Sequence, residues 1–319
     1  GAGRWFFFSA ILPKFAAMFL LPDFKIPITR LFSRNGCELV VKREDLVHPE
    51  ISGNKYWKLF YSVNTYLSEN PSSKLLVTFG GAYSNHIAAT AAAGKIFNVP
   101  TMGIVRGEEL DTLPLNSTLR QAEADGMTLR FVSRTDYRNI NKLTAELQQE
   151  FPNALIIPEG GTTPGAVEGV RHMLDERTAD FDYLCSAVGT GGTLAGLSRF
   201  SNEGQKVIGF NVVADSSLRE RIASLSGKTN FDLVEAAFGG YGHIMPEVVS
   251  FVNGFYSEYN LPLDPIYTGK MMMKLLQLLD EGYFPSRSRI LAFHTGGLQG
   301  VAGANEWLQN KNRELIKHI

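Results

Sequence analysis

A glycine- and threonine-rich segment is the clearest local sign of chemistry in this 319-residue sequence. It reads Ala-Val-Gly-Thr-Gly-Gly-Thr-Leu-Ala-Gly over residues 187–196 and follows an apolar run typical of a buried strand. Glycines let backbone N–H groups approach an anion closely, and a helix beginning near Thr193 adds the partial positive charge of its N-terminus. Thr190 and Thr193 add hydroxyl donors. The segment predicts a phosphate site, and a tight strand–helix turn without a ligand is the alternative.

Two phosphate-binding motifs that the segment lacks limit the class of phosphate ligand it could bind. A P-loop needs Gly-Lys-Ser/Thr, but Gly196 is followed by Leu197 and Ser198. The dinucleotide fingerprint G-x-G-x-x-G fails because Leu194 occupies the place of its third glycine. A single phosphate monoester is therefore favoured over a nucleoside triphosphate.

A phosphate monoester held at a helix N-terminus is typical of pyridoxal 5'-phosphate (PLP), a cofactor that also needs a lysine to form a Schiff base. Lys55 is a candidate because Gly53 and Asn54 form a cap-like turn before it at an expected helix start. A lysine amine removed from water has a lowered pKa and becomes nucleophilic. Lys58 is equally eligible from the local sequence, and most lysines face solvent. The residues alone leave the choice between the two lysines open.

The elements that must position these residues alternate between short β-rich runs and helical stretches, which predicts parallel sheets covered by helices. The expected strands are 37–42, 74–79, 101–105, 128–132, 154–157, 183–187, 207–213 and 290–293. The expected helices are 55–68, 85–97, 140–151, 165–175, 194–200 and 269–281. Glycine-rich turns follow four of the strands, at 80–81, 160–161, 189–192 and 296–297. Because parallel sheets bind ligands at the carboxyl ends of their strands, these turns predict one shared cleft.

Composition narrows the class of protein. The formal net charge of -1 gives no overall field that favours nucleic acid or a membrane surface. The two cysteines, Cys37 and Cys185, cannot build a disulfide framework and suit a reducing compartment, which predicts a cytoplasmic protein. The apolar runs 5–12 and 15–21 are too short to span a bilayer and are expected to form an ordered N-terminal arm rather than a cleaved signal. No zinc motif and no G-x-S-x-G elbow occurs, so we expect no metal site and no hydrolase triad.

Seven blocks of sequence, in order along nearly the whole chain, resemble the fold-type-II PLP enzymes. More narrowly, they are similar to the 1-aminocyclopropane-1-carboxylate (ACC) deaminase and D-cysteine desulfhydrase family. The blocks are Lys-Arg-Glu-Asp-Leu at 42–46 with Gly-Asn-Lys at 53–55, Gly-Gly-Ala-Tyr-Ser-Asn-His at 80–86, Pro-Glu-Gly-Gly at 158–161, the glycine loop at 189–193, Gly-Tyr-Gly at 240–242, Leu-Asp-Pro-Ile-Tyr-Thr-Gly-Lys at 263–270 and His-Thr-Gly-Gly at 294–297.

The resemblance implies an α/β fold like that of the tryptophan synthase β subunit. Two open twisted, mostly parallel sheet domains would hold PLP in the cleft between them. Residues 1–56 and 168–319 would form the large PLP-binding domain, and residues 57–167 the small domain. The family also implies a homodimer that acts on a small amino acid, with no nucleic acid or membrane partner.

Roles for individual residues also follow from the resemblance. The implied catalytic residues are Lys55, Ser84, Tyr241 and Tyr267. Those implied to bind the cofactor are Lys55, Asn85, Gly189, Thr190, Gly191, Gly192, Thr193 and Thr295. Those implied to bind the substrate are Ser84, Asn85, His86 and Gly161. Taken without the resemblance, Ser84 reads as a helix N-cap and each tyrosine as a core aromatic with a bonded hydroxyl.

Three departures from the family pattern bear on the reaction. Trp57 replaces a usual arginine and Tyr83 a usual glutamine, and both are expected to reshape the pocket mouth. Thr268 replaces the glutamate that the deaminases place near the pyridine nitrogen. The resemblance places the Thr295 hydroxyl near the pyridine nitrogen of PLP instead. Because a hydroxyl does not enforce protonation of the pyridine ring, elimination from Cβ is favoured.

The resemblance and these departures together predict a D-cysteine desulfhydrase, which converts D-cysteine to pyruvate, sulfide and ammonia. ACC deaminase is the closest alternative. The alternatives of another class are a non-catalytic PLP-binding protein and a module that binds a phosphorylated ligand through the glycine loop alone.

Overall fold

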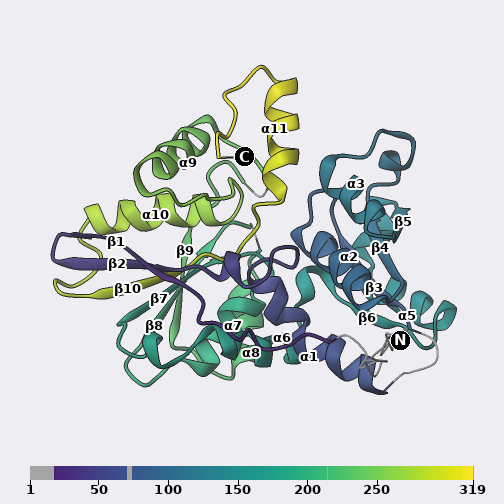
Figure 1. The fold of residues 1–319 in the computed structure, drawn as a ribbon, viewed down its shortest axis with the longest axis horizontal. Helices are drawn as coiled ribbons and strands as arrows, with labels where there is room; N and C mark the ends of the chain where they lie inside the picture. Colours follow the sequence, from purple (N-terminus) through teal and green to yellow (C-terminus); the bar gives the residue numbers. More distant parts are fainter. Residues whose placement is uncertain (1–17, 70–73, 214, 241, 319) are drawn as a thin grey trace, which may run out of the picture.

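The computed structural model describes residues 18–69, 74–213, 215–240 and 242–318. Its strands form two sheets, one of six and one of four strands, which lie side by side with helices packed around them (Figure 1). The expected α/β fold with two mostly parallel sheets is confirmed.

The larger sheet has the strand order β1-β2-β10-β7-β8-β9. Its strands are β1 Ile28–Arg34, β2 Cys37–Lys42, β7 Tyr183–Val188, β8 Lys206–Asn211, β9 Phe231–Glu235 and β10 Arg289–Phe293. Only β1 pairs in the antiparallel sense, with β2. Strand β7 is buried along its whole length, because helices cover both faces of the sheet around it.

The smaller sheet is entirely parallel, in the order β5-β4-β3-β6. Its strands are β3 Leu76–Gly80, β4 Thr101–Arg106, β5 Met127–Val132 and β6 Leu155–Ile157. Strand β3 is central and fully buried, in keeping with its apolar sequence without alternation.

The helices are α1 Asn54–Glu69, α2 Asn85–Phe97, α3 Ser117–Ala124, α4 Arg134–Arg138, α5 Ile140–Glu150, α6 Pro164–Val170, α7 Gly192–Phe200, α8 Leu218–Ser226, α9 Pro246–Tyr259, α10 Thr268–Asp280 and α11 Gly300–Asn310. Helix α2 illustrates how local sequence sets these bounds. The Ser84 side chain caps its N-terminus, an alanine-rich run fills its middle, and Asn98 ends it in the left-handed conformation at φ 54°.

Several expected elements have different bounds. The helix expected over 165–175 ends at Val170 and is followed by a 3-10 turn at Arg171–Met173. Asp175 lies beyond this turn, where it caps the next 3-10 turn through the Arg177 N–H and binds Lys42. The strand expected over 207–213 ends at Asn211, whose side chain accepts a bond from the Val213 N–H. Sequence patterns missed the edge strands β1 and β9, where polar residues interrupt the apolar pattern.

The chain leaves the larger sheet after β2 along α1 and returns to it after β6 along α6, and these two helices pack against each other. The boundaries expected at residues 57 and 168 lie in these two helices and stay a prediction. The expected N-terminal arm over residues 1–17 falls outside the described residues. Among the helices of the described chain, none is both long and apolar enough to cross a membrane.

Candidate active site

A cavity of about 520 Å³ lies between the carboxyl ends of the two sheets. Its volume is in the range of small-molecule sites, which is roughly 300–1,000 Å³. Residues from all four glycine-rich turns line it: Gly81, Gly160, Gly189 to Gly192, and Gly296 with Gly297. The prediction of one shared cleft is therefore confirmed.

Lys55 projects from the first turn of α1 into this cavity. The turn before it fits closely against the end of β10, since a Cβ atom at Gly53 would lie 2.0 Å from the Thr295 carbonyl oxygen. The Asn54 N–H donates to that same oxygen at 3.2 Å, and the Asn54 side chain bonds Thr193 Oγ1 at 2.8 Å. The lysine therefore starts from a turn that is fixed both to β10 and to the glycine loop.

The environment of the Lys55 amine makes it nucleophilic. Burial lowers its pKa to about 8, although the nearby Asp264 carboxylate opposes the shift. Its Nζ atom donates to Asn54 Oδ1 at 2.9 Å. A substantial fraction of this amine is neutral near physiological pH, as attack on an aldehyde requires.

The glycine loop forms a cradle for an anion at the N-terminus of α7. Gly191 adopts φ +90°, and no side chain caps the helix, so its first N–H groups have no acceptor within the helix. A Cβ atom at Gly192 would lie 2.8 Å from Thr162 Oγ1 and 3.1 Å from Lys58 Cε. Only glycine leaves this space for a ligand.

Lys58 is the second buried amine of the cavity. Its Nζ atom donates to the Gly160 carbonyl oxygen at 2.5 Å, to Thr162 Oγ1 at 3.0 Å and to Thr190 Oγ1 at 3.4 Å. Burial and the neighbouring Lys55 hold its pKa well below the ordinary value. All three acceptors are neutral, so an arriving phosphate would supply the counter-charge that this amine lacks. The spacing of three residues from Lys55, which puts both on one face of α1, is the sequence signal for this role.

The start of α2 brings the Ser-Asn-His block into the cavity wall. Ser84 Oγ accepts from the N–H groups of His86 and Ile87, so it is an N-cap and also lines the cavity. A Cβ atom at Gly297 would lie 2.9 Å from Asn85 Nδ2, so the amide of Asn85 sits against the turn after β10.

The His86 imidazole is buried beside the two lysines. Neither ring nitrogen has a hydrogen-bond partner among the described residues, although the residue is only 1% exposed. Burial, then Lys55 and Lys58, hold its pKa well below the ordinary value, so the ring is neutral. Gly161 does not line the cavity itself; it leaves room for the ring, because a Cβ atom there would lie 2.7 Å from His86 Cε1.

Asp264, which sequence reasoning missed, organises the start of α10. Its carboxylate accepts bonds from the N–H groups of Ile266, Tyr267 and Thr268 and from the Thr268 hydroxyl at 2.6 Å. Tyr267 thereby lies along the glycine loop, with Cε1 3.2 Å from the position of a Cβ at Gly189.

Asp264, Tyr267 and Thr295 line the cavity, whereas Thr268 does not. The Thr268 hydroxyl points to Asp264 instead. Tyr241, the other expected tyrosine, lies outside the described residues.

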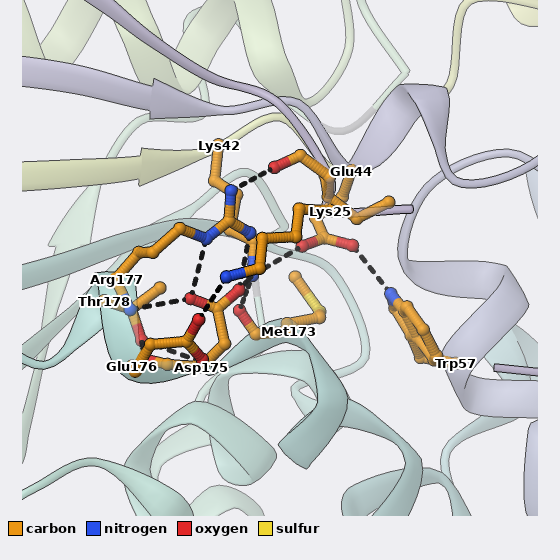
Figure 2. Close-up of polar contacts among 10 residues, drawn as sticks. Lys25, Lys42, Glu44, Trp57, Met173, Asp175, Glu176, Arg177 and Thr178 are labelled. Atoms are coloured by element: carbon orange, nitrogen blue, oxygen red, sulfur yellow. Dashed lines mark hydrogen bonds and ion pairs between the residues drawn. The ribbon is translucent and has the colours of Figure 1, made fainter. Parts of the chain in front are cut away.

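The expectation that Trp57 lies at the pocket mouth is wrong. The indole is 2% exposed, does not line the cavity, and donates through Nε1 to Glu44 Oε2 at 2.7 Å (Figure 2). An α-helix turns by about 100° per residue, so Trp57 points roughly 200° away from Lys55.

Tyr83 does lie at the pocket mouth, as expected. Its ring packs on α11, where a Cβ atom at Gly303 would lie 3.1 Å from it. Helices α3 and α11, which face each other in Figure 1, are joined by an ion pair between Arg120 and Glu306.

The residues present fit PLP. A buried amine of lowered pKa, an uncapped helix N-terminus and a second buried amine without a counter-charge line one cavity. Among the described residues, no cluster of three or more His, Cys, Asp or Glu side chains is arranged to hold a metal ion.

Comparison with known proteins agrees with this geometry. The family model described as "Pyridoxal-phosphate dependent enzyme" matches residues 24–296, which is most of the chain. The chain belongs to this family. PLP is therefore its cofactor, as expected from the sequence.

Relatives of this PLP-dependent enzyme place it among the deaminases and desulfhydrases. A putative ACC deaminase of Pyrococcus horikoshii is 31% identical over 92% of this chain and 95% of its own. The bifunctional D-cysteine desulfhydrase/ACC deaminase of Arabidopsis thaliana is 31% identical over 84% of this chain and 74% of its own. The crystal structure of an ACC deaminase homologue superposes with a TM-score of 0.77 at 29% identity, covering 93% of this chain and 96% of the other. The expected family and its fold are confirmed.

Proposed function

We propose that this PLP-dependent enzyme catalyses β-elimination from a small amino acid, with D-cysteine as the first substrate and pyruvate, sulfide and ammonia as products. The observation that carries the proposal is that Lys55, the glycine loop and the Thr295 hydroxyl line one cavity, while position 268 contributes no acid to it. The carboxylate of Asp264, which the Thr268 hydroxyl contacts, already accepts four hydrogen bonds.

In this proposal the phosphate end of PLP is held by the N–H groups at the start of α7 and by Lys58. Lys55 would hold the cofactor through its amine, and the same amine would serve as the base that takes the proton from the substrate Cα. When bound, PLP supplies an electron sink for the pair released at Cα. Ser84 and Asn85, at the start of α2, would receive the substrate carboxylate. Tyr267, which lines the cavity beside Gly189, would give a proton to the departing β-substituent.

The deciding experiment supplies the holoenzyme with D-cysteine, L-cysteine, β-chloroalanine, D-serine and ACC, and measures keto acid and sulfide together. We expect equal amounts of pyruvate and sulfide from D-cysteine and little 2-oxobutanoate from ACC. Turnover of ACC at a rate matching that of D-cysteine would make ACC deaminase the better assignment. If the absorbance spectrum of the bound cofactor stays the same when each amino acid is added, the protein would instead be a PLP-binding protein without turnover.

Two further properties belong to the same proposal. The reducing cytoplasm fits two cysteines that are both buried and unpaired. A homodimer is proposed from the family resemblance alone. Light scattering of the purified holoenzyme tests it, and a monomeric mass would contradict it.

A further inference from the structure

Arg106 is a charged residue of the cavity wall that the proposed reaction does not use. It is the last residue of β4 and lines the cavity at the carboxyl end of the smaller sheet. Its Nη2 atom lies 3.6 Å from the position of a Cβ at Gly81, just before the loop that leads into Ser84 and Asn85. The guanidinium is therefore next to the segment proposed to receive the substrate carboxylate.

The protein supplies no anion to this guanidinium among its described residues. The segment after β4 contains Glu108, Glu109 and Asp111, but none of them forms an ion pair with Arg106 in the described part of the chain, and Glu109 Oε1 accepts from Arg134 at 2.6 and 3.1 Å. Arg106 lies over the face of Tyr137, whose ring centroid is 5.5 Å from Cζ. A cation–π contact of this kind orients the guanidinium but leaves its N–H donors free.

The other charges of the cavity are engaged or lie elsewhere. Arg221 forms an ion pair with Asp215, and Asp264 is occupied by the start of α10. Glu159 follows β6, which is separated from β4 by β3 in the sheet, so the two strands are about 10 Å apart. Arg106 is therefore a surplus positive charge in a partly desolvated space, where a guanidinium favours a carboxylate-like partner.

We infer that Arg106 binds an anionic group carried by the substrate in addition to its α-carboxylate. The preferred substrates are then small amino acids with an acidic β-substituent, such as a carboxylate or sulfonate attached through sulfur. The inference rests on the proposed β-elimination and narrows its substrate class.

For S-carboxymethylcysteine the reaction is balanced with water alone. The Cβ–S bond breaks, its electron pair leaves with sulfur, and the sulfur takes up a proton to give thioglycolate. Hydrolysis of the remaining three-carbon fragment consumes one water and gives pyruvate and ammonia.

The test compares S-carboxymethylcysteine with S-carbamoylmethylcysteine, its neutral isostere, each in the D and L forms. We expect the holoenzyme to prefer the acid, and Arg106→Gln to lower kcat/KM for the acid about 10- to 100-fold, mainly through KM. The same variant should change kcat/KM for the amide by less than about threefold. Arg106→Lys should recover part of the loss because it restores the charge without the fork of donors.

Arg138→Gln is the matched control. It removes a positive charge from the exposed surface of α4, a helix that does not line the cavity, and should leave both substrates unaffected. Equal loss of both substrates in Arg106→Gln would overturn the inference, since Arg106 would then serve the α-carboxylate or the fold. A wild-type enzyme without preference for the acid would also overturn it.

Calorimetry of both compounds with the loaded enzyme separates this inference from the proposed reaction. Tighter binding of the acid, lost in Arg106→Gln, would support the anion site even if no pyruvate forms. Absence of pyruvate from D-cysteine and from both compounds would refute the β-elimination itself.

Discussion

Trp57 donates its indole N–H to Glu44 and thereby ties the helix of Lys55 to a buried ionic cluster. This cluster consists of Lys42, Glu44, Asp175 and Arg177 (Figure 2). Lys42 Nζ lies 3.5 Å from Glu44 Oε1, which has no hydrogen-bond partner in the described part of the chain. Hydrogen bonds from Arg177 and Lys42 outweigh burial and hold the pKa of Asp175 well below its ordinary value.

Glu44 should make stability depend on pH in an unusual direction. Burial raises its pKa from 4.5 to about 7, and the nearby Lys42 offsets only part of this. The unfolded chain then loses the proton at lower pH than the folded one, so ionisation favours unfolding. Between pH 4.5 and 7 we expect this residue to remove up to about 3 kcal/mol from the free energy of unfolding. The free energy of unfolding, measured by chemical denaturation at several pH values, should decrease less between pH 4.5 and 7 in Glu44→Gln than in the wild type. The same decrease in both proteins would contradict the prediction.

Substitution of Trp57 should affect mainly the stability of the protein, whereas substitution of Tyr83 should affect mainly substrate binding. Trp57→Phe leaves a buried carboxylate oxygen without its donor and should cost about 1–3 kcal/mol of stability, with KM unchanged. Tyr83 is 54% exposed at the cavity mouth, so Tyr83→Gln should change KM while stability stays within about 0.5 kcal/mol. Urea melts and steady-state kinetics of both variants check this, and the reverse pattern would show that we have misplaced the two rings.

The lowered pKa of Lys55 should govern cofactor uptake. With a pKa of about 8, about one amine in ten is neutral at pH 7 and about nine in ten at pH 9. The rate at which PLP becomes covalently attached to the apoprotein should therefore rise with pH through a midpoint near 8. Stopped-flow absorbance can measure it, and a midpoint near 10 would mean that the amine is solvated. Lys55→Ala is the control and should show no attachment.

Lys58 should recognise the phosphate rather than the aldehyde. We expect Lys58→Gln to weaken PLP binding about 10- to 100-fold, because a charge-assisted contact to the phosphate is lost. Binding of pyridoxal, which has no phosphate, should change little. Fluorescence titrations with both compounds make the comparison, and equal weakening of the two would argue that Lys58 only supports the shape of the cavity.

Much of the fold was predictable because buried parallel strands have a plain signature. Strands β3 and β7 are apolar without alternation, and the glycine-rich turns after them correctly indicated one cleft. The strands β1 and β9 were not predictable in this way, because polar residues interrupt their apolar pattern.

The parts of the site built from glycine-rich turns were predictable from the sequence, whereas the roles of individual side chains were not. Choosing Lys55 over Lys58 required the family resemblance, since both lysines share one face of α1. Arg106 has no local signature, because its place in the cavity wall depends on strands and turns distant in sequence. Asp264 does have one, since it accepts bonds from N–H groups two to four residues later, as a capping aspartate before a helix does. The error about Trp57 was avoidable, since helical geometry alone turns it away from Lys55.

The fit of Gly53 against the backbone of Thr295 has a consequence for biosynthesis. The segment that carries Lys55 is translated well before the surface that fixes it. A nascent chain stalled before β10 would carry Lys55, Lys58 and the glycine loop but would lack the backbone against which the lysine turn packs. We therefore expect this turn to reach its final position only after β10 and the residues that follow it have been translated.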